Sequence, residues 1–116
     1  MIRAETVKTW LEKTTDKLYE KINADFVKST GSPILEKDNS WCVRIDIRTS
    51  DDGHRTVALR TDSMAYEVLY DPSIADYNWS ARYHDTFREK FEKRFEEHGL
   101  YLEREGQGVL VVGGVK

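Results

Sequence analysis

The sequence has one cysteine, two prolines and no long apolar run, and each absence excludes a class of protein. Cys42 cannot form a disulfide within the chain. The first twenty residues lack the apolar core and the small-residue cleavage site of a secretory signal. No apolar stretch approaches the roughly 18 residues that span a bilayer. We therefore expect a cytoplasmic protein without a membrane-spanning segment.

Neither sign of charge dominates the chain. The 18 Lys and Arg residues and the 21 Asp and Glu residues are interleaved and leave a net charge of −3. No basic block of the kind typical of DNA-binding proteins is present. Because the chain is 39% hydrophobic and 34% charged, it belongs with globular proteins and has a strongly ionic surface. A length of 116 residues predicts one domain, residues 1–116.

The motifs of common catalytic and metal sites are also missing. The possible soft metal ligands lie far apart and lack the spacing of a zinc site: Cys42, His54, His84 and His98. No nucleophile motif or phosphate-binding glycine loop occurs. The acidic residues Asp46, Asp62 and Glu67 lack the neighbouring lysine of a metal-dependent nuclease hairpin. We expect a domain that is not an enzyme and holds no metal or cofactor.

Helical periodicity identifies two amphipathic helices. One helix is predicted from Ala4 to Ser29 and ends before Gly31 and Pro33. The other is predicted from about Ser80 to His98 and ends before Gly99. Aromatic residues recur every four positions along the second helix and form its apolar stripe: Tyr83, Phe87, Phe91 and Phe95.

Alternating patterns predict the strands. Apolar and polar residues alternate from Trp41 to Thr49, and a three-residue loop ending at Gly53 would place Ile47 opposite Val57 and Ile45 opposite Leu59. Met64 to Tyr70 alternates again and predicts a third strand. Two further strands, Leu100 to Arg104 and Val109 to Val112, form a closing hairpin, and the last is apolar on both sides and so interior.

The expected fold is therefore α+β: an antiparallel sheet of about five strands with both helices on one face, in the order α-β-β-β-α-β-β. Because helices cover only one face of this sheet, the other face is available for contact with a second copy of the chain in a homodimer. In element order the chain resembles the small dimeric chaperones of bacterial type III secretion, which are also acidic and begin with a helix. This resemblance is one of topology.

The main functional candidate is an irregular aromatic segment after the third predicted strand. Large rigid side chains are over-represented among interface anchors, and four lie close together here: Tyr70, Ile74, Tyr77 and Trp79. The alternative is that they cover one end of the core. Trp10 and Tyr19 on the first helix also exceed what a minimal core needs. We expect an adaptor, inhibitor or small chaperone that binds another protein through this segment and the exposed side of the first helix.

Two other hypotheses remain open. Arg44, Arg48 and Arg60 share the outward face of the predicted sheet and could bind nucleic-acid phosphates, although Asp46 and Glu67 share that face. A small-molecule site or hydrolase near His84 and Tyr77 would require a pocket between the irregular segment and the sheet. A half-buried, hydrogen-bonded histidine is the simpler interpretation of His84.

Overall fold

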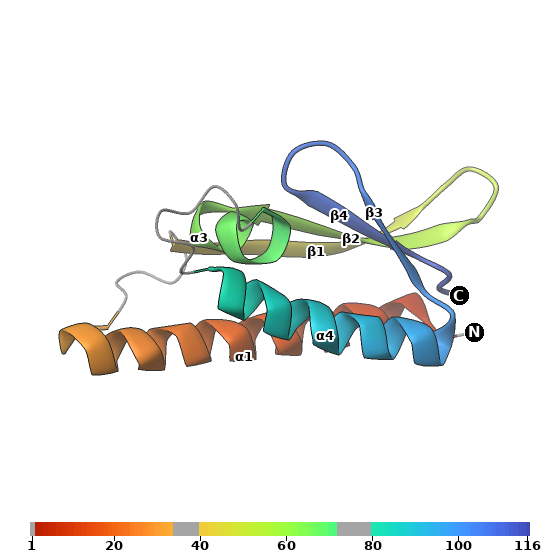
Figure 1. Ribbon diagram of the computed structural model, residues 1–116. Helices are drawn as coiled ribbons and strands as arrows, with labels where there is room; N and C mark the ends of the chain where they lie inside the picture. The colour runs from red at the N-terminus through yellow and green to blue at the C-terminus, as the bar shows by residue number, and fades with distance from the viewer. Residues whose placement is uncertain (1, 34–39, 72–79) are drawn as a thin grey trace.

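The computed structural model describes residues 2–33, 40–71 and 80–116 of the chain. Figure 1 shows two layers, an antiparallel sheet and a pair of long helices that both cover the same face of it. The four strands lie in the order β1-β2-β4-β3. The α+β class and the one-sided helix layer are confirmed. In chain order the elements are α1 (Ala4–Thr30), β1 (Trp41–Thr49), β2 (Arg55–Asp62), α3 (Ser63–Ala65), η1 (Tyr66–Tyr70), α4 (Ala81–His98), β3 (Tyr101–Arg104) and β4 (Val109–Gly113).

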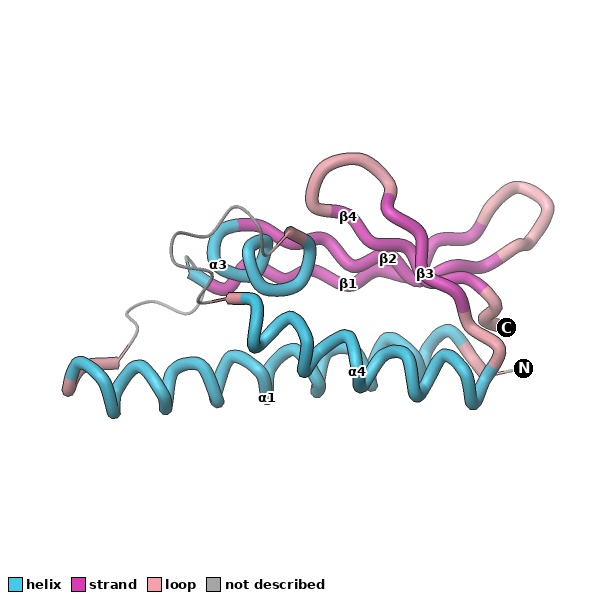
Figure 2. Tube along the Cα trace, viewed as in Figure 1, coloured by secondary structure: helices cyan, strands magenta, loops and turns pink. Residues whose placement is uncertain are grey.

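The first helix ends where the sequence predicts. Gly31 takes a left-handed conformation with φ of 78°, and its N–H donates to the carbonyl of Val27. Figure 2 shows α1 running beside α4 along the length of the sheet. No helix within the described ranges is long and apolar enough to cross a membrane.

The first hairpin has the predicted register. Ile47 lies opposite Val57 and Ile45 opposite Leu59. The Ser50 N–H donates to the His54 carbonyl at 2.8 Å, so residues 51–53 form the loop, and Gly53 has φ of 85°. The requirement that apolar residues share one face was enough to fix this register.

The predicted third strand, Met64 to Tyr70, is wrong. This segment forms α3 and then the single π-helical turn η1, in which the Asp71 N–H donates to the Tyr66 carbonyl at 2.9 Å. The Asp62 carboxylate accepts from the Ser63 N–H at 2.7 Å and caps the start of the helix. The buried residues Ala65, Val68 and Leu69 follow helical spacing. A strand would have turned Ala65 and Leu69 away from the core, so the described residues form a sheet of four strands instead of about five.

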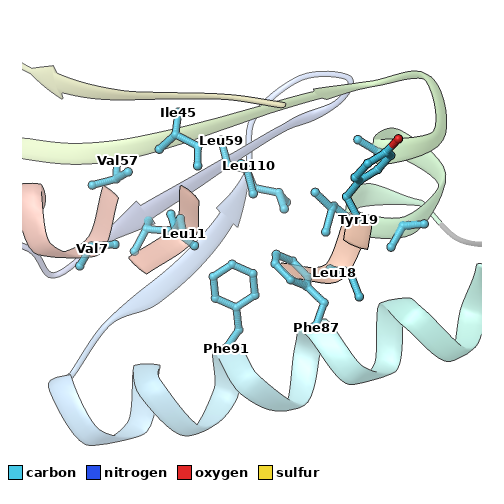
Figure 3. Packing of buried hydrophobic residues seen from close by; sticks show 14 of the residues in the cluster. Val7, Leu11, Leu18, Tyr19, Ile45, Val57, Leu59, Phe87, Phe91 and Leu110 are labelled. Carbon is cyan, nitrogen blue, oxygen red and sulfur yellow. The ribbon is translucent and has the colours of Figure 1, made fainter. Parts of the chain in front are cut away.

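The last strand, β4, takes its predicted place inside the sheet, and β3 forms an edge. β4 pairs with β2 on one side and with β3 on the other. Below it lies the core, in which Phe87 and Phe91 of α4 point toward Leu110 of β4 while Leu11 of α1 lies beneath Ile45 and Leu59 (Figure 3). On this side of the core, α1 and α4 form the outer layer of the molecule.

Candidate protein-binding site

Trp10 lies half-buried between the two long helices. Its ring packs edge-on against Phe91 of α4, with ring centres 5.1 Å apart and an interplanar angle of 74°. The guanidinium carbon of Arg94 lies 5.4 Å from the centre of the Trp10 ring. One side of the indole therefore contacts the core, and a cation lies over its ring.

A groove of about 620 Å³ runs past Trp10 between α1 and α4. It continues into a second hollow that shares Trp10 and Arg94. Five of the residues that line these two hollows carry positive charge: Lys13, Lys17, Lys90, Lys93 and Arg94. Across the described ranges, none of the five forms an ion pair. We call these five residues and Trp10 the cationic groove.

Helical spacing explains why the cations gather. Lys13 and Lys17 are four residues apart on α1, and Lys90 and Arg94 are four apart on α4, so each pair lies along one side of its helix. Glu12 is exposed on α1 one position before Lys13, but it is rotated by about 100° around the helix axis and does not line the groove. Of the seven charged residues that line the two hollows, five are basic and two are acidic, so a chain of net charge −3 carries a local excess of positive charge here.

Two acidic residues also line the groove, and one of them is already engaged. The Glu5 carboxylate forms an ion pair with Arg55 at the start of β2. The hydrogen bond from Arg55 is the largest cause that holds the pKa of Glu5 below its usual range. Glu97 is therefore the one acidic groove residue without an ion pair in the described part of the chain.

A polar contact joins the two helices near the other end of α1. The Tyr83 hydroxyl donates to Asp25 Oδ2 at 2.6 Å and accepts from Arg82 Nη2 at 2.7 Å. The Tyr83 hydrogen bond is the largest cause that lowers the pKa of Asp25, and burial raises the pKa of Tyr83 above its usual value. This contact holds α4 beside α1 and so maintains the groove.

Of the four side chains of the predicted aromatic interface, Tyr70 is the one that lies within the described residues. The Tyr70 hydroxyl donates to the carbonyl of Gly106 at 2.6 Å, and its own carbonyl accepts from Arg104 at 3.0 Å. These contacts fasten the end of η1 to the closing hairpin. Ile74, Tyr77 and Trp79 lie outside the described residues, so the predicted aromatic interface stays a prediction.

The predicted arginine face is partly neutralised. The register places Arg44 opposite Arg60, and both side chains are exposed. Arg48 instead donates to the Glu105 carboxylate at 2.7 Å. Arg44 and Arg60 have no ion pair among residues 2–33, 40–71 and 80–116.

His84 makes a structural hydrogen bond. Its Nδ1 lies 2.7 Å from the carbonyl oxygen of Val68. Since a carbonyl can only accept, Nδ1 is the donor, and the bond ties α4 to η1. Within the described ranges, no group of three His, Cys, Asp or Glu side chains could hold a metal ion.

Sequence reasoning singled out Trp10 but missed the five cations around it. The two basic pairs at four-residue spacing, Lys13 with Lys17 and Lys90 with Arg94, are visible in the sequence, but which sides of the two helices lie together depends on the packing. No protein-family model, curated protein or solved structure matches this chain, so the likeness in element order to secretion chaperones stays an expectation.

Proposed function

We propose that the chain is a protein-binding domain that recognises an acidic segment of its partner through the cationic groove. The observation that carries this proposal is a concentration of five cations around a half-buried tryptophan on an otherwise acidic chain, none of them in an ion pair with another described residue. Trp and Arg are typical anchors of protein interfaces.

The shape of the site favours a helical or extended peptide. The α1 side of the groove carries Lys13 and Lys17, and Arg94 of α4 lies over the ring of Trp10 on the other side. An amphipathic helix could place its apolar side on Trp10 and its carboxylates beside the lysines. Trp10 packs edge-on against Phe91, and Arg94 lies over its ring, so it is a poorer platform for stacking nucleic-acid bases.

The test compares charge reversal inside and outside the groove. A fluorescent glutamate-rich helical peptide is titrated against the wild type, Lys13→Glu/Lys17→Glu, and the matched control Lys28→Glu/Arg60→Glu. Reversal of two groove charges should weaken binding about tenfold, because each contact changes from attraction to repulsion. The control has the same net charge and should bind as the wild type does. Equal weakening in both variants would show a response to net charge and would contradict the proposal.

A second candidate function rests on Arg44 and Arg60, two like charges opposed across one strand pair. A phosphate between them would relieve their repulsion, which keeps nucleic-acid binding open. A single-stranded oligonucleotide titrated at low and high salt tests it. Binding that disappears in Arg44→Gln/Arg60→Gln but survives in Lys13→Glu/Lys17→Glu would support this second candidate over the first.

A further inference from the structure

The outer edge of β1 is a long strand edge that pairs with no other strand of the described residues. β1 stands at the end of the sheet order, and within residues 2–33, 40–71 and 80–116 no strand pairs with its other side. Its pairing with β2 runs without a bulge from Cys42 to Thr49, and it contains no proline. No charged residue points inward from it. Bulges, prolines and inward-pointing charges usually prevent a strand edge from pairing with another chain, and β1 has none of the three.

The hydrogen-bonding groups at this edge can be assigned from the hairpin. Ser50 and His54 form a hydrogen-bonded pair. Because such pairs alternate along an antiparallel ladder, the even-numbered residues of β1 bond to β2. The odd-numbered residues therefore direct their N–H and C=O groups to the open edge, and their side chains point toward the core.

We propose that this edge pairs with the same edge of a second copy of the chain, antiparallel and centred on Ile45. In this register Trp41 faces Thr49 of the second copy, so every residue of β1 is paired. The odd-numbered residues meet one another, which satisfies their backbone groups. The two four-stranded sheets then become one continuous sheet.

The charges on β1 select this register. Centring on Ile45 places Arg44 beside Asp46 of the second copy, twice by symmetry. Centring on Asp46 would instead oppose Arg44 to Arg48 and Asp46 to its own copy, and like charges directly opposite one another destabilise a sheet. Centring on Ile47 would pair Asp46 with Arg48, which is also a favourable charge pair. It would, however, leave residues 41–44 of each copy unpaired.

The other edge of the sheet is a weaker candidate. β3 covers only Tyr101–Arg104, and all four of its residues are exposed. β1 is nine residues long and presents Val43, Ile45 and Ile47 on its inner face. A dimer through β1 would bring these apolar residues against their counterparts beneath the extended sheet.

The test uses charge complementation measured by light scattering after size-exclusion chromatography. The wild type should be a dimer that dissociates on dilution. Arg44→Asp and Asp46→Arg should each be monomeric, because each places like charges opposite one another. An equimolar mixture of the two should form a heterodimer, in which every Asp again faces an Arg. Circular dichroism of each variant controls for folding.

A cross-link tests the register itself. In the proposed dimer Cys42 faces Arg48 of the second copy, so Arg48→Cys should form an intermolecular disulfide on mild oxidation. Thr56 lies on the same face as Arg48 but on β2, one strand farther from the edge, so Thr56→Cys should not cross-link.

A wild type that is monomeric at every accessible concentration would overturn the proposal. So would a pair of charge variants that leave the dimer intact, which would place the interface elsewhere or indicate a different partner strand. Neither result bears on the cationic groove.

Discussion

At the scale of single residues, the contact between Tyr83 and Asp25 makes the pairing of the helices depend on pH. The folded-state pKa of Asp25 lies below its ordinary value, so this contact stabilises the fold above about pH 3.9 and is lost as pH falls through the folded-state pKa. The pKa of Tyr83 is raised, so its contribution is present below about pH 10 and is lost as pH rises through the folded-state pKa.

Replacing the hydroxyl should separate these effects. In Tyr83→Phe, the pKa of Asp25 should rise toward the ordinary aspartate value, because its main hydrogen-bond donor is gone. Carboxyl-carbon NMR titration of Asp25 measures this directly. Tyr101→Phe, which alters an exposed tyrosine, is the control and should leave Asp25 unchanged. An Asp25 pKa that does not move in Tyr83→Phe would assign its shift to Arg82 or the nearby lysines.

At the scale of the elements, the closing hairpin depends on a glycine that lies against β2. Gly108 has φ of 78°, and a Cβ added to it would lie 2.7 Å from the Thr61 carbonyl oxygen. Gly53 has a similar φ of 85°, but nothing lies within 4 Å of an added Cβ. The two positions share the backbone strain and differ in the available space.

Alanine at these two glycines should therefore have unequal costs. Gly53→Ala should lower the free energy of unfolding by about 1–2 kcal/mol, the cost of a left-handed non-glycine residue. Gly108→Ala should cost about 1–3 kcal/mol more, because a backbone carbonyl must also move. Urea denaturation of the two variants measures the difference. Equal losses would show that β2 and β4 separate easily at this point.

The elements that sequence reasoning recovered are those with one consistent periodicity. α1, α4 and the first hairpin follow helical or alternating spacing throughout, and the register of the hairpin followed from matching its apolar faces. Residues 64–70 satisfy both periodicities: Met64, Tyr66, Val68 and Tyr70 alternate, while Ala65, Val68 and Leu69 follow a helix. The Asp62 cap and the core space beside η1 favour the helix, and the core space depends on tertiary packing.

The candidate site was less predictable than the fold. The sequence suggested the exposed side of the first helix and an excess aromatic residue in Trp10. It could not show that Lys13 and Lys17 share a hollow with Arg94, because that depends on how two helices separated by residues 31–80 pack side by side.

At the scale of the whole molecule, one core joins the sheet to both helices. Phe87 is 2% exposed and points from α4 toward the strands. Phe87→Ala should lower the free energy of unfolding by about 3–5 kcal/mol. Tryptophan fluorescence, which reports on Trp10, Trp41 and Trp79, and far-UV circular dichroism should give the same transition midpoint.

The control for this core variant is Phe26→Ala, because Phe26 is 43% exposed. It should change stability by about 0.5 kcal/mol or less. Two separate transitions in the wild type would contradict a single cooperative domain over residues 1–116.

The cationic groove makes the electrostatic attraction of an acidic partner depend on which part of the surface it approaches. With a net charge of −3, the chain as a whole repels an acidic partner at low ionic strength, when fields extend far into solution. At physiological salt the Debye length is about 8 Å, so a partner experiences mainly the charges nearest to it. Encounters of an acidic partner at the cationic groove are then attractive. Salt should therefore affect the association rate in two opposing ways, first by removing long-range repulsion and then by weakening local attraction.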